Sequence, residues 1–240
     1  MSSLEQIIKD ILKDTPVGEG IDLRLIVDKN IDVELTKGLE LYNLEKGISI
    51  NVDGQNSIIS KINQINDSFI NEQIGLKFKV DHLNSKAYDI ETIDKTPNKW
   101  DKELIDYLNE QYENGEYLIY NDKLILKGDK SSPGNYWTGS WRSEYDLSNG
   151  KGEINIDVHY YEDGNVRLQS KKTSIEIDPK NLVKSIKKIE DDLQISLNKE
   201  FLKLNELIFK QLRRQLPITR SKMNWGKAIG NYKLGKNINQ

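Results

Sequence analysis

The chain has 240 residues, of which 35 are Lys or Arg and 38 are Asp or Glu, so its formal net charge is −3. This near balance argues against a dedicated nucleic-acid binder, which is usually strongly basic. The absence of Cys excludes disulfide scaffolds, Cys zinc sites, iron–sulfur clusters and thiol catalysis, and two His are too few for a His-rich metal site.

The first residues, MSSLEQIIKDILKD, are charged throughout and lack the apolar centre of a signal peptide. No stretch approaches the roughly 18 consecutive apolar residues that a membrane-spanning helix needs. Together with the lack of Cys, these features lead us to expect a cytoplasmic protein without a transmembrane segment.

Charge is distributed unevenly along the chain. Residues 201–240 contain nine basic residues and one acid, Glu206, a net charge of +8, whereas residues 1–200 carry −11. A basic end on an acidic body predicts an acidic partner surface. A solvated terminal helix that has no partner would give the same pattern.

The N-terminal segment is predicted to be helical. Ser3 can cap the first helix, and Thr15-Pro16 ends it because the residue before a proline avoids the α region. Two further short segments, about 21–27 and 33–44, complete an expected antiparallel helical layer. The positions of the first helix that we expect to be buried are Leu4, Ile7, Ile8, Ile11 and Leu12.

The next part of the chain is predicted to mix strands with one helix. Residues 48–52 and 76–80 alternate like strands, Asp53-Gly54 predicts a tight turn, and residues 89–99 are predicted to form a polar loop. Residues 100–111 predict a helix that stops at Asn114-Gly115. The helix positions expected to be buried are Leu104, Ile105 and Leu108.

From Glu116 the apolar period changes to two, which predicts about five consecutive antiparallel strands with one face covered. Asn121-Asp122 is predicted to turn the first hairpin, and Glu162-Asp163-Gly164-Asn165 to turn a later one. The expected inward rows are Trp137, Gly139, Trp141, Ser143 and Tyr145 on one strand, and Ile154, Ile156, Val158 and Tyr160 on the next.

Asp178-Pro179 is a strong helix start, with Asp as the N-cap and Pro at the first helical position. Pro217 ends the pattern, so the predicted helix has a length of about 57 Å. It should extend beyond one subunit's strands. Its apolar stripe consists of Leu182, Ile186, Ile189, Leu193, Leu197, Leu204, Ile208 and Leu212.

No motif in the chain indicates catalysis or cofactor binding. A phosphate-binding loop, a dinucleotide-binding glycine motif and a metal-ligand His spacing are all absent. The sequence Glu162-Asp163-Gly164-Asn165 is too short for a calcium loop, and a turn explains it better. His159 falls on the more polar sheet face, where a structural or interface role is favoured over catalysis. We expect no enzyme activity, no cofactor and no metal.

Two long segments identify a family resemblance. Val158-His159-Tyr160-Tyr161-Glu162-Asp163-Gly164-Asn165-Val166 and the segment from Phe209 to Trp225, FKQLRRQLPITRSKMNW, resemble the two signatures of the F-actin capping protein alpha subunit. Shorter similarities lie at 78–83 and 137–145. The resemblance covers most of the chain and is strongest from about residue 100 onward.

The resemblance implies an α+β fold in an obligate heterodimer with a beta subunit. In that arrangement a five-stranded antiparallel sheet joins the partner's sheet, and a long C-terminal helix crosses it. The divisions expected within one structural domain are a helical stalk at 1–45, a middle region at 46–115, the sheet at 116–177, the long helix at 178–216 and a C-terminal tentacle at 217–240.

The resemblance further implies that the dimer binds the barbed end of an actin filament, independently of calcium, and blocks subunit addition and loss. It implies phosphoinositide binding at the same basic face and a location in the cortical actin cytoskeleton. The implied actin-binding residues are Lys210, Arg213, Arg214, Arg220, Lys222 and Trp225. Trp225 would contact actin or the dimer surface, or alternatively pack on the long helix.

The predicted subunit-interface residues are Trp137, Trp141, His159, Tyr160 and Leu193. Trp137, Trp141, Tyr160 and Leu193 are expected to be buried only in the heterodimer, so the isolated chain would expose an apolar patch and aggregate. Two other classes stay open at this point. One is an adaptor that binds anionic lipid or nucleic acid through its basic tail, and the other is an enzyme with an unrecognised site.

Overall fold

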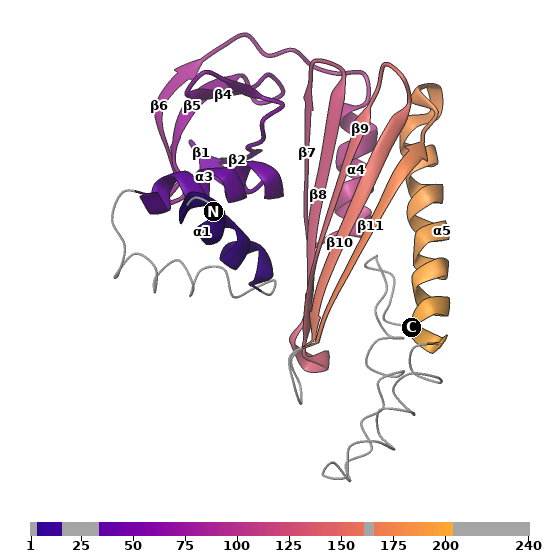
Figure 1. Cartoon of the computed structure of the whole chain (residues 1–240). Helices are drawn as coiled ribbons and strands as arrows, with labels where there is room; N and C mark the ends of the chain where they lie inside the picture. Colours follow the sequence, from indigo (N-terminus) through magenta and orange to yellow (C-terminus); the bar gives the residue numbers. More distant parts are fainter. Residues whose placement is uncertain (1–3, 16–33, 161–165, 204–240) are drawn as a thin grey trace.

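A computed structural model describes residues 4–15, 34–160 and 166–203 of the chain. These residues form an α+β structure with three antiparallel sheets. The five-stranded sheet separates α4 and α5 on one side from α1, α3 and the smaller sheets on the other (Figure 1). The mixed helix and antiparallel-sheet class predicted from the sequence is therefore confirmed.

The N-terminal helices pack on one another through a narrow apolar seam. Helix α1 (Leu4–Asp14) ends before Pro16 as predicted, and α3 (Glu34–Lys46) matches the segment expected at 33–44. Ile8 and Leu12 are buried against Leu39. The prediction was wrong for Ile7 and Ile11, which stay exposed because α3 covers only one stripe of α1. The segment expected at 21–27 lies outside the described residues.

A small β-rich region follows α3. Strands β1 (Ser49–Val52) and β2 (Gln55–Ile58) form the predicted hairpin, in which Asp53 and Gly54 both have positive φ, as a two-residue turn of this type requires. A four-stranded sheet in the order β3-β4-β5-β6 packs beside it around Phe69 and Phe78. Its strands are β3 (Gln64–Ile65), β4 (Ser68–Asn71), β5 (Leu76–Asp81) and β6 (Lys86–Thr92).

The predicted polar loop at 89–99 was wrong at its start, because residues 86–92 form strand β6. This strand is exposed along nearly its whole length, so it has no apolar alternation that a sequence could reveal. Cross-strand ion pairs to β5 accompany its backbone ladder: Lys77 Nζ lies 2.7 Å from Glu91 and Lys79 Nζ lies 2.9 Å from Asp89.

Helix α4 (Asp101–Gln111) lies where the sequence predicted a helix, but its buried face is rotated. Leu104 and Leu108 are buried as expected, whereas Ile105 is 46% exposed and Tyr107 is buried in its place. The helix also ends before Asn114-Gly115, because Tyr112 has an extended backbone and strand β7 already begins at Asn114.

The five-stranded sheet is a meander in which every strand pairs with its neighbours in the chain. The turn residues Asn121 and Asp122 have positive φ, as expected for the first hairpin. The turn predicted at 162–165 lies outside the described residues. The strands are β7 (Asn114–Tyr120), β8 (Lys123–Ser132), β9 (Trp137–Asp146), β10 (Lys151–Tyr160) and β11 (Val166–Glu176), with a short 3-10 helix (Pro133–Asn135) before β9.

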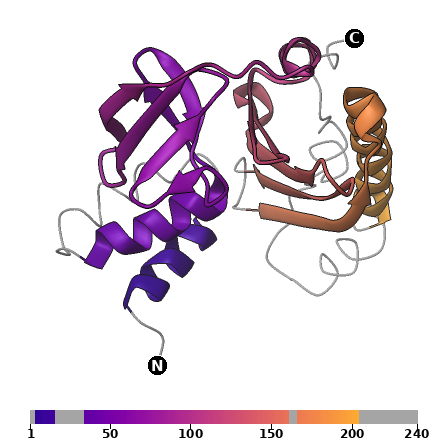
Figure 2. The same ribbon diagram turned by 90° about the horizontal axis from the view of Figure 1, so that it is seen from above.

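Helix α5 covers the apolar face of this sheet (Figure 2). Asp178 accepts a hydrogen bond from the Lys180 amide at 2.9 Å and caps a 3-10 turn (Pro179–Asn181) that leads into α5 (Leu182–Lys203). Leu182, Ile186 and Leu193 are buried in the main core with side chains of α4, β8, β9 and β10. The part of the predicted helix beyond residue 203 lies outside the described residues.

Candidate partner-binding surface

The two edges of the five-stranded sheet differ. Strand β7 forms one edge, and β2 and β4 pack against it. The carboxamide of Gln73 also bonds twice to this edge: its Nε2 donates to the Ile119 carbonyl at 2.8 Å, and its Oε1 accepts from the Ile119 amide at 3.2 Å. A side-chain amide thus takes the place of a neighbouring strand at this point.

Strand β11 forms the opposite edge. It has 11 residues, and its outer side pairs with no strand in the part of the chain that the structure describes. Residues 171–174 at its centre are exposed. Lys171 lies 2.9 Å from Glu153 of the neighbouring strand. A long unpaired edge is a ready template for another strand, and lysines on it discourage indiscriminate pairing.

Several large apolar side chains of the helices are exposed. Ile7 and Ile11 lie one turn apart on α1, with 44% and 50% of their surface accessible, and Ile195 of α5 is 53% exposed. Scattered exposed apolar residues are common in folded proteins. The pair on α1 is more informative, because i and i+4 positions form one continuous patch on a helix.

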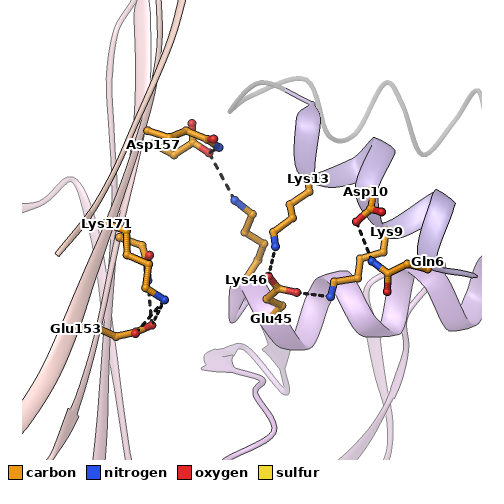
Figure 3. Close-up of polar contacts among 11 residues, drawn as sticks. Gln6, Lys9, Asp10, Lys13, Glu45, Lys46, Glu153, Asp157 and Lys171 are labelled. Carbon is orange, nitrogen blue, oxygen red and sulfur yellow. Dashed lines mark hydrogen bonds and ion pairs between the residues drawn. The ribbon is translucent and has the colours of Figure 1, made fainter. Parts of the chain in front are cut away.

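The other face of the sheet has two parts: at β7 and β8, Leu118 and Ile125 are buried against Ile58 of β2, whereas toward β10 and β11 the face is polar and is joined to α3 by a charged group (Figure 3). Asp157 of β10 is the centre of this polar part: the Arg167 Nε and Nη2 atoms donate to its carboxylate at 2.8 and 2.6 Å, and Gln169 donates at 3.1 Å. Lys46 of α3 approaches to 3.5 Å from the other side. Burial opposes ionisation of Asp157, but these hydrogen bonds and the Arg167 charge outweigh it and hold its pKa below the usual value.

Two more contacts complete this junction, which borders a cleft of about 430 Å³. Glu45 of α3 binds both Lys9, at 2.6 Å, and Lys13 of α1. Burial raises the pKa of Glu45, but the hydrogen bonds and charges of the two lysines lower it by more, so the pKa ends below its usual value. Arg142 of β9 lies against Gly47, where a Cβ atom would come within 2.9 Å of its Nε. Local sequence patterns carry no signal for these contacts, because the residues that form them are far apart in the chain.

The structure corrects the expected burial of the predicted interface residues. Trp141, His159 and Leu193 are 2%, 2% and 6% exposed within the single chain, so the prediction that Trp141 and Leu193 are buried only in a heterodimer was wrong. Helices α4 and α5 already cover the sheet face that carries Trp141. The side chains of Trp137 and Tyr160 lie outside the described residues.

The predicted actin-binding residues also lie outside the described residues. They are Lys210, Arg213, Arg214, Arg220, Lys222 and Trp225. The same holds for most of the basic segment at 201–240, so its role stays a prediction.

Membrane-spanning helices and clustered metal ligands are both absent from the described residues. No helix among residues 4–15, 34–160 and 166–203 is long and apolar enough to cross a bilayer. Within the same ranges, no three His, Asp or Glu side chains come together in a way that could hold a metal ion.

Comparison with known proteins gives a consistent result. The family model for the F-actin capping protein alpha subunit matches residues 8–237. The F-actin-capping protein subunit alpha of Candida glabrata is 40% identical over 100% of this chain and 98% of that protein, and that of Saccharomyces cerevisiae is 37% identical over 98% and 97%. A structure described as the homodimeric actin capping protein alpha subunit from Plasmodium berghei shares the fold, with a TM-score of 0.58, 20% identity, and coverage of 90% of this chain and 98% of that one.

An open sheet edge and exposed apolar side chains on a helix are typical of a subunit of a larger assembly. The matches over nearly the whole length establish which kind of subunit it is. The chain belongs to the F-actin capping protein alpha subunit family, whose role is structural and not catalytic.

Proposed function

We propose that this chain pairs with an F-actin capping protein beta subunit, and that the dimer binds filament barbed ends and blocks actin subunit addition and loss without calcium. The observation that carries this proposal is the family match over residues 8–237, supported by relatives that align from end to end. We expect the dimer to act in the cytoplasm, at cortical actin.

The β11 edge is the proposed place where the sheet continues into the partner. Gln73 and the β-rich region occupy the β7 edge, which leaves β11 as the edge that can accept another strand. The exposed Ile7 and Ile11 would give a helical stalk formed by residues 1–45 a second contact with the partner. The divisions at 46–115, 116–177, 178–216 and 217–240 belong to the same proposal.

Hydrogen exchange tests the proposed edge directly. We expect amides of residues 168–174 to exchange more slowly in the dimer than in the isolated chain, and those of β7 to be unchanged. At high concentration the isolated chain should associate with itself, as measured by size-exclusion chromatography, so the exchange comparison uses dilutions at which it is monomeric. If the β11 amides exchange as fast in the dimer as in the isolated chain, the partner does not bind at this edge.

The basic segment at 201–240 is the proposed actin contact, with a net charge of +8 toward an acidic filament end. Exposed charges act mainly on the association rate and are screened by salt. Acidic phosphoinositides would compete for the same residues. Trp225 would add an apolar contact within the proposed tentacle.

The decisive experiment is a seeded actin elongation assay with the co-expressed dimer, with and without a calcium chelator. A complete lack of elongation block would refute the proposal. Charge reversal of Lys210, Arg214 and Arg220 should slow capping, whereas reversal of Lys184, Lys188 and Lys199, which are exposed on α5, should not. Pelleting with anionic liposomes or DNA instead of filaments would favour the basic-tailed adaptor.

A further inference from the structure

Helix α5 carries a glutamate, Glu190, whose carboxylate is buried between the helix and the sheet, next to the main apolar core. Glu190 is 5% exposed and lies among the residues that hold α5 on the sheet. A charged carboxylate in such a place is unfavourable unless its oxygens are hydrogen-bonded or a counter-charge is close. The surroundings of Glu190 supply hydrogen bonds to one carboxylate oxygen but not to the other.

Two tyrosines satisfy one oxygen of Glu190. The Tyr107 hydroxyl of α4 donates to Oε2, and the Tyr112 hydroxyl donates to the same atom at 3.0 Å. The other oxygen, Oε1, is buried and accepts no hydrogen bond from any residue that the structure describes. A glycine positions Tyr112, because a Cβ atom on Gly128 would lie only 2.1 Å from its ring.

A lysine completes the cluster from the sheet. Lys130 of β8 places its Nζ atom 4.7 Å from the centre of the Tyr112 ring, a cation–π contact. Burial lowers the pKa of Lys130 to about 8, although the charges of Glu190 and Glu113 oppose this shift. Burial also raises the pKa of Tyr145, which faces the cluster from β9, so that this hydroxyl stays neutral at physiological pH.

The same burial acts on the carboxyl group. Desolvation raises the pKa of Glu190 to about 7, while the two tyrosine hydroxyls and Lys130 work against the rise and Asp191 adds to it. Protonation of Glu190 therefore changes within the physiological pH range, at the contact between α5, α4 and the sheet.

We propose that Glu190, Tyr107, Tyr112 and Lys130 form a proton-sensitive clasp that sets how firmly α5 is held on the sheet. Through α5, the clasp would also influence the basic segment that follows in sequence. Only this second effect rests on the proposed capping function.

The pH dependence has a defined sign. A carboxyl group whose pKa is higher in the folded state than in the open state stabilises the folded state fully at low pH. That stability is lost as the pH rises from the usual Glu value toward about 7. For Lys130, with its lowered pKa, stability returns only as the pH rises above about 8. The clasp is thus firmest in mild acid and weakest between these two values.

The test is hydrogen exchange of the α5 amides, corrected for intrinsic rates, on the full chain alone and co-expressed with a beta subunit. In the wild type, the opening equilibrium of residues 186–197 should rise about 50-fold between pH 5 and pH 7.5. In Glu190→Gln the rise should disappear, and the helix should be better protected than the wild type at pH 7.5. Asp192→Asn, at an exposed position on the same helix, is the matched control and should keep the wild-type profile.

A second variant distinguishes the pH-dependent effect of the clasp from a loss of side-chain packing. Tyr107→Phe removes a hydrogen bond that favours the ionised carboxyl, so the midpoint of the transition should move to higher pH. A role in packing alone would weaken protection equally at every pH. Identical pH profiles for Glu190→Gln and the wild type would overturn the proposal.

The functional effect is measured separately, as the dissociation rate of the dimer from barbed ends at pH 6 and pH 7.5. The wild type should dissociate faster at the higher pH, and Glu190→Gln should show no such difference. If no variant caps filaments, the proposed function fails, and hydrogen exchange still decides whether the clasp exists. If capping is normal but independent of pH in the wild type, the influence of the clasp on the tail is refuted.

Discussion

The two faces of the five-stranded sheet are built from the same strands but make different kinds of contact with the rest of the protein. On one face, Trp141, Ile156 and their neighbours are packed under α4 and α5 in the largest apolar core that the described residues form. On the other face, Asp157 forms an ion pair with Lys46 of α3 and Arg142 lies against Gly47, while Leu118 and Ile125 pack on Ile58 of β2. Alternation along each strand sends one set of residues to each face.

This difference indicates how the two layers contribute to the protein. Burial of apolar surface is strong and non-directional, so the helix-covered face should carry most of the stability. Charged contacts contribute less net energy but have fixed geometry. The charged contacts of the polar face should therefore affect the position of the N-terminal helices more than the stability of the sheet.

The largest expected effect is on the apolar face. Trp141→Ala should lower the free energy of unfolding by about 3–5 kcal/mol, because it removes a large side chain from a packed core and leaves a cavity. Chemical denaturation monitored by circular dichroism measures this loss. A loss below about 1 kcal/mol would mean that the partner, and not α4 and α5, provides the packing around Trp141.

On the polar face, Asp157→Asn should cost about 1–3 kcal/mol, because it leaves Arg167 and Lys46 without their carboxylate. The lowered pKa of Asp157 means that its contribution is present above the usual Asp value and is lost as the pH falls through the lowered one. The difference between wild type and variant should accordingly vanish in strong acid. Denaturation curves at neutral and acidic pH check both statements.

The glycine in the junction tests whether its geometry matters. Gly47 has φ of +62°, and a Cβ atom there would lie 2.9 Å from the Arg142 guanidinium. Gly47→Ala should cost about 1–2 kcal/mol through backbone strain and displacement of Arg142. Gly54→Ala is a useful comparison, since its φ of +81° is also positive but nothing lies near its Cβ position. An equal loss in both variants would assign the whole effect to the backbone.

The smallest effect is expected at the rim between the helices. Lys187 of α5 lies 3.5 Å from Glu110 of α4, with about half of each side chain exposed. Such pairs are screened by water and salt, so Lys187→Ala should change the free energy of unfolding by less than about 0.5 kcal/mol. A loss comparable to that of Asp157→Asn would contradict the proposed ranking of surface and buried charges.

Local patterns in the sequence determined a large part of this protein. The meander followed from a period of two with turn residues at Asn121-Asp122, and the start of the last helix followed from Asp178-Pro179. These features were predictable because strand alternation, turn chemistry and helix capping depend on residues close together in the chain. The family was predictable for a related reason, since its two signatures are continuous strings.

Only the tertiary structure decided which surfaces are covered. Helical spacing placed Ile7, Ile11 and Ile105 among the core candidates, yet too few neighbours reach them. Glu190 sits one turn after Ile186 on the apolar stripe, a signal that could have marked it, but its burial depends on Tyr107, Tyr112 and the sheet. Burial is a non-local property, set by segments that meet only after the chain has folded, so a periodic pattern can indicate a face without showing what packs on it.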